Sequence, residues 1–91
     1  MYTVYIIQSQ KDNSYYIGHT DDLDDRMARH NQGKSKYTKS KIPWYLVHTE
    51  KYETRGEAMK REYEIKKKKS KNYIEWLMKN NKSFWDGSSV G

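Results

Sequence analysis

The chain contains no cysteine. Disulfide bonds and thiolate metal sites are therefore excluded, and the absence fits a reducing compartment. The first residues lack the charged, apolar and small-residue succession of a signal peptide, and no apolar run approaches the ~20 residues needed to span a bilayer. We therefore expect a cytoplasmic protein that does not enter a membrane.

Apolar residues are also scarce, at 34% of 91 residues, whereas aromatic residues make up 14%, with nine Tyr and three Trp. A chain of this length forms one domain, and it buries only about 60–65% of the surface that its unfolded form exposes. We therefore predict one domain over residues 1–80 with a small, aromatic-rich core. A flexible C-terminal tail is expected over residues 81–91.

Positive charge is concentrated in one part of the chain. Residues 54–82 hold ten Lys or Arg and four Asp or Glu, whereas the rest holds eight of each, so the formal net charge of +6 lies in this region. A one-sided basic field favours a polyanionic partner, most simply nucleic acid. The alternative is a solvated Lys-rich helix face that serves solubility.

Three strands are predicted from runs of β-branched and aromatic residues. They cover residues 2–8, 15–19 and 44–50. Asp12 and Asn13 lie between the first two runs, and both residue types favour turns. The first two strands should therefore form a hairpin.

Three helices are predicted between and after these strands. The first is capped by Thr20 or Asp21 and stops near Gly33. The second begins at a capping box and covers about 54–69, and the third covers about 70–80. The element order is β-β-α-β-α-α, and the predicted fold class is α+β, a three-stranded antiparallel sheet flanked by helices.

Glu62 is an anomaly among the charged residues. At about 100° per residue, it shares one stripe of its predicted helix with Ala58 and Ile65, and that stripe should face the sheet. A carboxylate on this face is costly unless it is paired, hydrogen-bonded or bound to a metal. A salt bridge, a hydroxyl partner and a metal ion are all open alternatives.

Arg26 and His30 share a face of the first helix because they are four residues apart. A guanidinium suits a phosphate oxygen, and an imidazole can transfer a proton near neutral pH. The alternative is an ion pair between Arg26 and Asp22, with His30 capping the helix end. His19 and His48 have no spacing that indicates a ligand set, and they are interpreted as strand-end residues.

Tyr5 and Tyr16 lie on neighbouring strands, and pairing across the hairpin could bring their hydroxyls together. A phenol has an ordinary pKa of about 10, so it is a poor base unless nearby positive charge lowers that pKa. The alternative is aromatic packing between strands. Gly18 follows closely and permits a backbone approach that a side chain would block.

Taken together, these residues resemble the GIY-YIG nuclease superfamily, and in particular its short, stand-alone bacterial members. Thr3-Val4-Tyr5 stands at the first part of the signature, where Thr3-Val4 replaces Gly-Ile, and Tyr16-Ile17-Gly18 matches the second part. Residues 20–33 are similar to the first helix of the family. Residues 58–62 are similar to the helix that carries its metal-binding glutamate. The similarity covers about residues 2–78.

The resemblance implies hydrolysis of a DNA phosphodiester bond on a three-stranded antiparallel sheet. By position, Tyr5 would help to activate water. Tyr16 would orient the water or the phosphate. Either Tyr5 or His30 would be the final proton acceptor.

The resemblance also implies the groups that handle charge. Arg26 would stabilise negative charge on the phosphate, and Glu62 would hold one Mg²⁺ ion. Gly18 would keep the site open. A single carboxylate fits one Mg²⁺, since this ion fills its other positions with waters and phosphate oxygens.

The predicted function is therefore a Mg²⁺-dependent DNA endonuclease, either structure-selective or directed by a protein partner. The alternatives are a nucleic-acid-binding module of the same fold with little activity, and a protein-interaction adapter. Lysines are the expected contacts to the nucleic-acid backbone: Lys34, Lys36, Lys66, Lys67, Lys68 and Lys69. The choice between DNA and RNA, and the oligomeric state, stay open.

Overall fold

The computed structural model describes residues 1–68 and 70–80. Lys69 and the predicted tail lie outside the described residues. The elements appear in the predicted order. The strands are β1 (Tyr2–Ser9), β2 (Tyr15–Thr20) and β3 (Trp44–Tyr52), the α-helices are α1 (Leu23–Asn31), α2 (Arg55–Lys68) and α3 (Lys71–Asn80), and a short 3-10 helix, η1 (Lys39–Lys41), precedes β3. This turn lies between α1 and β3.

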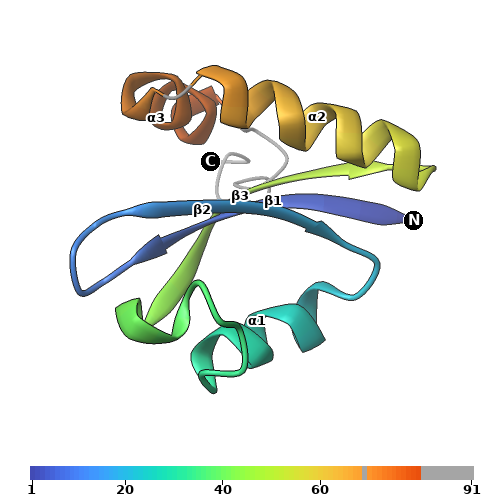
Figure 1. Ribbon diagram of the computed structural model, residues 1–91. Coiled ribbons are helices and arrows are strands. Elements are labelled where there is room, and N and C mark those ends of the chain that lie inside the picture. The colour runs from blue at the N-terminus through green and yellow to red at the C-terminus, as the bar shows by residue number, and fades with distance from the viewer. Residues whose placement is uncertain (69, 81–91) are drawn as a thin grey trace, which may run out of the picture.

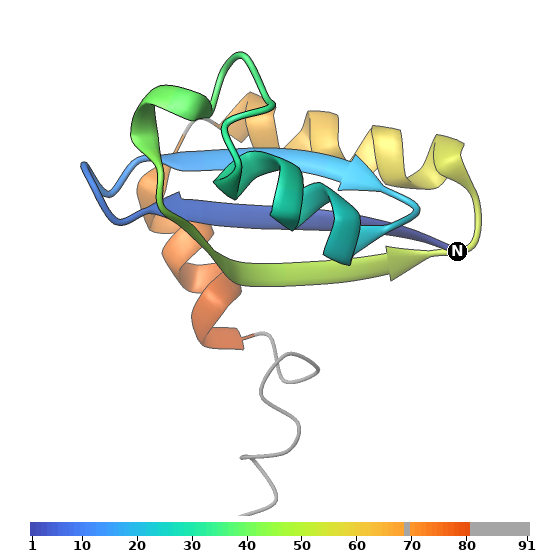
Figure 2. The same ribbon diagram turned by 90° about the horizontal axis from the view of Figure 1, so that it is seen from below.

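The three strands form one antiparallel sheet in the order β2-β1-β3, which confirms the predicted α+β fold class. The first strand of the chain is thus the central one, as Figure 2 shows. Four successive residues of β1, Val4 to Ile7, are completely buried. A strand that is covered on both faces buries every side chain, whichever way it points.

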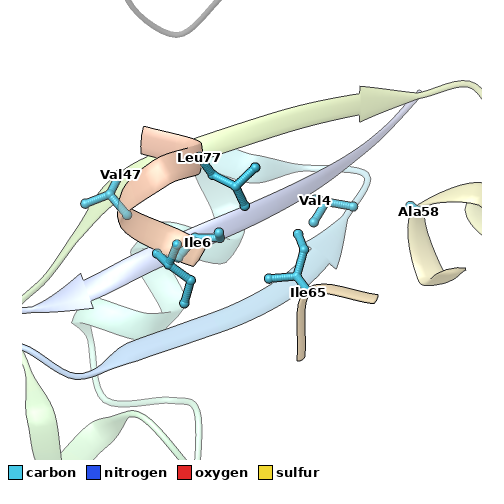
Figure 3. Packing of buried hydrophobic residues seen from close by; sticks show 7 residues of the cluster. Val4, Ile6, Val47, Ala58, Ile65 and Leu77 are labelled. Carbon is cyan, nitrogen blue, oxygen red and sulfur yellow. The ribbon is translucent and has the colours of Figure 1, made fainter. Parts of the chain in front are cut away.

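The helices form a layer on each side of the sheet. Helices α2 and α3 cover one face, and α1 covers the other (Figure 1). The side chains that fill the α2 and α3 side are aliphatic (Figure 3): Val4, Ile6, Val47, Ala58, Ile65, Ile74 and Leu77. The α1 side is more aromatic, with Tyr5 and Trp44 beside Ile7. The site described below therefore begins in an aromatic layer.

The N-cap of helix α1 lies one or two residues after the predicted caps, Thr20 and Asp21. Asp22 is the N-cap, and its carboxylate accepts the backbone N–H of Asp25 at 3.1 Å. Thr20 instead accepts the backbone N–H of Asp22 at 3.0 Å, so its hydroxyl shapes the turn before the helix. The predicted stop is confirmed, because Gly33 follows the helix with φ of +78°. Lys34 donates back to the carbonyl of Arg29, as in a Schellman motif.

Helix α2 is fixed at its start and along its length. Thr54 and Glu57 form the predicted capping box through two reciprocal bonds of 3.2 and 3.3 Å. One turn further on, Arg61 donates two hydrogen bonds, of 2.7 and 3.1 Å, to the carboxylate of Glu50 on β3. His48 and Tyr52 bind the same carboxylate, each at 2.7 Å. This network sets the rotation of α2 over the sheet.

The charge of Glu50 is strongly favoured in this network. Burial alone would raise the pKa of Glu50, but the hydrogen bonds from His48, Arg61 and Tyr52 outweigh it and lower the pKa to about 2.

Among residues 1–68 and 70–80, no helix is long and apolar enough to cross a membrane.

Candidate active site

Tyr5 and His30 form the buried centre of the site. Both side chains are almost fully buried, and the Tyr5 hydroxyl lies 3.0 Å from Nε2 of His30. The other ring nitrogen, Nδ1, lies 2.8 Å from the hydroxyl of Thr38. Trp44 then donates its indole N–H to the Thr38 carbonyl at 2.8 Å. His30 is therefore part of a hydrogen-bonded chain, and the alternative in which it caps the end of α1 is wrong.

Both central groups are neutral near pH 7. Burial, and then the nearby Tyr16, raise the pKa of Tyr5 to about 12, although Arg26 lowers it in part. Burial lowers the pKa of His30, and the charge of Arg26 lowers it further. A neutral imidazole has one nitrogen that donates and one that accepts. It can therefore take a proton from Tyr5 at Nε2 while Nδ1 donates to Thr38.

Gly18 explains how the Tyr5 ring fits beneath β2. The two residues are direct partners in the β1–β2 ladder. An added Cβ on Gly18 would lie 2.6 Å from the Tyr5 hydroxyl and 2.8 Å from Cζ. These distances are shorter than non-bonded contacts allow, so a side chain at this position would displace the phenol.

Tyr16 packs beside this pair and does not bond to it. Its ring meets those of His30 and Trp44 edge-on, with centroid distances of 5.1 and 6.4 Å. The ring of Tyr5 is 6.4 Å away. Within residues 1–68 and 70–80 the Tyr16 hydroxyl makes no hydrogen bond. Aromatic packing, the alternative role for Tyr16, is therefore present, and its hydroxyl is free to bind a further group.

Arg26 stands at the mouth of the buried centre. It lines a hollow of about 140 Å³ with Tyr2, His19, Thr20, Asp21 and Arg55. No carboxylate of the described residues lies within ion-pairing distance of Arg26, so the expected pair with Asp22 does not form. The next arginine of the same helix, Arg29, does pair with Asp25, at 3.4 Å. Arg26 is therefore the guanidinium of α1 that is available to an anion.

Glu62 lies across β2 from this centre, on the α2 side of the sheet. Its side chain is 17% exposed, and each oxygen has a partner at 2.6 Å. His19 donates to one oxygen, and Lys66 donates to the other. Burial alone would raise the pKa of Glu62, but Lys66 and His19 lower it overall. Glu62 is therefore ionised, and the salt-bridge alternative from the sequence is the arrangement seen here.

His19 joins the two sides of the site. Successive residues of a strand point to opposite faces, so Gly18 faces α1 whereas His19 faces α2. His19 lines the hollow that contains Arg26, and it also lines a second hollow of about 180 Å³ with Met59, Glu62, Tyr63 and Lys66. The charge of Glu62 reaches Tyr5, since it helps to raise the pKa of the phenol. The site is thus a band around the β2 edge of the sheet.

Sequence reasoning missed His19 and Thr38. His19 was interpreted as a strand-end residue, although two separate patterns point to it. Strand alternation directs His19 to the α2 face, and the stripe that contains Glu62 directs that carboxylate to the same face. Thr38 carries no local signal, because its contact with His30 depends on how the loop after α1 folds back.

A metal ion can be accommodated at Glu62 only with most of its ligands from elsewhere. The described residues contain no group of three or more His, Cys, Asp or Glu close enough to form a complete protein site. One ionised, partly exposed carboxylate beside a hollow fits Mg²⁺, which keeps several waters and binds phosphate oxygens. Lys66 would then have to yield one oxygen. The donor set fits one hard divalent cation held by Glu62.

The predicted nucleic-acid contacts divide between the two faces of the sheet. Lys34 and Lys36 are exposed in the loop after α1, and Lys66, Lys67 and Lys68 are exposed on α2. The loop and α2 lie on opposite faces beside β2 (Figure 2). Lys69 falls outside the described residues. The basic residues therefore flank the band from both sides.

Comparisons with known proteins show the family of the chain. Residues 1–83 match the GIY-YIG catalytic domain, and the chain belongs to this family. A UPF0213 protein of Staphylococcus haemolyticus is 52% identical over 64 residues, covering 69% of this chain and 77% of that protein. A UPF0213 protein of Halobacterium salinarum is 46% identical over 67 residues, covering 72% and 86%.

A solved structure extends the comparison to the fold. The solution structure of a UPF0213 protein from Bacillus halodurans aligns with this chain at a TM-score of 0.56 and 34% sequence identity. The alignment covers 100% of this chain and 98% of that protein. Within the GIY-YIG family, the chain is thus one of the small UPF0213 proteins of bacteria and archaea.

Proposed function

We propose that this protein is a DNA endonuclease that hydrolyses a phosphodiester bond with one divalent metal ion, most simply Mg²⁺. The observation that carries the proposal is the convergence of five groups around β2. The Tyr5 hydroxyl lies 3.0 Å from Nε2 of His30, and Arg26 lies beside this pair. His19 lines the same hollow as Arg26 and donates a hydrogen bond to Glu62. Membership of the GIY-YIG family supports the same reaction.

The proton pathway begins at the Tyr5 hydroxyl. Because burial keeps the pKa of Tyr5 near 12, the phenol acts as a relay and not as a standing base. It passes a proton to Nε2 of His30 as it accepts one from the attacking water. The Thr38 hydroxyl bonds to Nδ1 and can accept its proton in a hydrogen bond while Nε2 receives the proton of Tyr5. We therefore assign the role of final proton acceptor to His30.

Arg26 and Glu62 handle the charge of the phosphate. The guanidinium of Arg26, which has no carboxylate partner among the described residues, donates to the phosphate oxygens as negative charge develops there. Glu62 is the group that would hold the divalent cation, and His19 positions its carboxylate. When bound, this cation supplies Lewis-acid stabilisation of the same charge. The hydroxyl of Tyr16, which has no hydrogen-bond partner among the described residues, would orient the water or the phosphate.

Nicking assays on single-stranded, duplex and branched DNA test the proposal directly. Tyr5→Phe, Arg26→Ala and Glu62→Gln should each abolish Mg²⁺-dependent nicking. The matched controls are Tyr45→Phe, Arg29→Ala and Glu53→Gln, which change exposed residues of the same types. These controls should keep the activity of the wild type. Nicking that survives all three site variants would refute the proposal.

A second candidate is a nucleic-acid-binding module with little activity. It is favoured by one observation, since both oxygens of Glu62 already bind cationic or donor groups. On this reading Lys66 stays on Glu62, and DNA binds without cleavage. Salt-sensitive DNA binding by the wild type, with no nicking at any Mg²⁺ concentration, would favour the module.

The preferred DNA structure and any targeting partner form the finer part of the proposal. The described residues are one sheet with its three helices, and they leave no separate unit to read a long DNA sequence. We therefore propose that selection depends on DNA structure or on a protein partner. The comparison of single-stranded, duplex and branched substrates tests the first of these routes.

A further inference from the structure

A third hollow lies between α2 and α3, on the flank of α2 away from Glu62. Its volume is about 580 Å³, within the usual range for sites that bind small ligands. The residues that line it are charged or aromatic: Arg61, Glu64, Lys67, Lys68 and Tyr73. We call this feature the α2–α3 hollow. None of its residues belongs to the active site described above.

The cations of the α2–α3 hollow differ in how far they are neutralised. Arg61 is held by Glu50 at 2.7 Å and by Glu64 at 3.5 Å, so its charge is balanced within the protein. Lys67 and Lys68 have no carboxylate within ion-pairing distance among the described residues, and both are exposed. The hollow therefore offers two ammonium groups that have no carboxylate partner among the described residues, beside a guanidinium that Glu50 holds in place.

Two aromatic rings lie together beside the hollow: Tyr73 lines it, and Trp76 stacks on Tyr73 and lines a neighbouring hollow with Asn72, Glu75 and Lys79. Tyr73 and Trp76 are nearly parallel, with an angle of 14° and a centroid distance of 6.2 Å. Arg61 and Lys68 lie 6.0 and 5.1 Å from the centroid of Tyr73, which fixes that ring from the side of α2. Trp76 remains 57% exposed. An indole this exposed, stacked on a ring that lines the hollow, is suited to stack on another flat ring.

The position of the hollow links it to the proposed cleavage site. At 100° per residue, Glu62 and Lys66 lie on one flank of α2, whereas Arg61 and Lys68 lie on the other. Tyr63 and Lys67 lie on the exposed crest between them. A helix is about 10–12 Å wide with its side chains, so a strand of a few nucleotides is long enough to cross the crest of α2. One strand can therefore run from Glu62 to the hollow, which Trp76 adjoins through Tyr73.

We propose that the α2–α3 hollow binds an unpaired DNA strand next to the scissile phosphate. Lys67 and Lys68 contact its phosphates, and a base stacks on Trp76. The identity of the ligand as DNA rests on the proposed function. A duplex keeps the faces of its bases stacked on one another, so stacking on Trp76 requires an unpaired strand. The hollow thus selects DNA with a single-stranded segment.

Binding assays in EDTA test this inference without any cleavage. The probes are a fluorescent twelve-residue oligo-dT and a duplex of equal length, measured by anisotropy. Trp76→Ala should weaken oligo-dT binding about tenfold, since base–aromatic stacking has this order of effect. It should change duplex binding less than twofold. Trp76→Phe should recover most of the lost affinity, because it restores an aromatic face.

The matched control is Tyr37→Ala, which removes a 79% exposed ring from the loop after α1. It should change oligo-dT binding less than twofold. Equal losses for Trp76→Ala and Tyr37→Ala, or equal losses on oligo-dT and duplex, would overturn the inference. So would wild-type affinity in Trp76→Ala. Far-UV circular dichroism checks that both variants keep the fold.

The same variants separate this inference from the proposed function. If Glu62→Gln loses nicking while Trp76→Ala binds oligo-dT as the wild type does, the nuclease stands and the hollow has no such role. If oligo-dT binding depends on Trp76 but the wild type never nicks DNA, the strand-binding hollow stands and the nuclease proposal fails.

Discussion

Gly18 on β2 lies over the phenol ring of Tyr5 on β1, its direct partner in the sheet. A Cβ on Gly18 would lie 2.6 Å from the Tyr5 hydroxyl, so the hydroxyl occupies the space that a side chain at this position would fill. That hydroxyl lies within hydrogen-bonding distance of His30, and the charges of Arg26 and Glu62 shift its pKa, Arg26 downwards and Glu62 upwards. The lack of a side chain at Gly18 on this edge strand therefore allows the Tyr5 hydroxyl to occupy its position in the site.

Gly18→Ala should abolish nicking and lower the free energy of unfolding by about 1–3 kcal/mol, the usual cost of overpacking. The control is Gly56→Ala in the first turn of α2, where an added Cβ would meet nothing within 4 Å. This variant should be as active as the wild type and equally or more stable. Urea denaturation and nicking measure both effects. An active Gly18→Ala enzyme would contradict the arrangement of Tyr5.

The pH profile of nicking should identify the proton acceptor. Burial holds the pKa of His30 below its ordinary 6.5, and it holds that of Tyr5 near 12. With His30 as acceptor, the rate should be flat from about pH 7 to 9 and fall only when His30 becomes protonated at lower pH. His30→Gln should remove this plateau. A rate that climbs tenfold per pH unit across the range would assign the step to another group.

His19→Ala should raise the Mg²⁺ concentration for half-maximal nicking by about 10- to 100-fold, the usual effect of removing the partner of a ligating carboxylate. His19 donates to Glu62 at 2.6 Å, and without it the carboxylate loses its orientation. Met59→Ala is the control, because Met59 lines the same hollow but makes no polar contact with Glu62. Equal Mg²⁺ requirements in the two variants would rule out a positioning role for His19.

Glu50→Gln should destabilise the protein at pH 7 by roughly 3 kcal/mol, since each pKa unit is worth 1.36 kcal/mol. The pKa of Glu50 falls from 4.5 to about 2 on folding, so its contribution is complete above about pH 4.5. It declines as the pH falls from 4.5 towards 2. Urea denaturation should therefore give a difference between wild type and variant that shrinks over this range.

Glu64→Gln supplies the control for the stability measurement. Glu64 contacts the same arginine, Arg61, but at 3.5 Å and with its side chain 50% exposed. An exposed pair of this kind contributes little, so the variant should lie within about 0.5 kcal/mol of the wild type. A loss as large as that of Glu50→Gln would mean that the network around Glu50 is not what holds α2 on β3.

Local patterns were sufficient to predict the elements, because each depends on neighbours in the sequence. The reciprocal bonds of Thr54 and Glu57, and the positive φ of Gly33, confirm the signals for a helix start and a helix stop. The N-cap of α1 was predicted one or two residues early. Thr20, Asp21 and Asp22 all suit an N-cap, and only the path of the chain out of β2 selects one of them.

Residue types and spacing were also enough to propose which side chains form the site, since a helix or strand fixes the direction of each side chain. They placed Arg26 and His30 on one face of α1 and turned Glu62 towards the sheet. The partners of these groups depend on which strands are adjacent and on how α2 is rotated. Contacts between elements far apart in the sequence carry no local periodicity, so only the tertiary structure put His19 against Glu62 and Thr38 against His30.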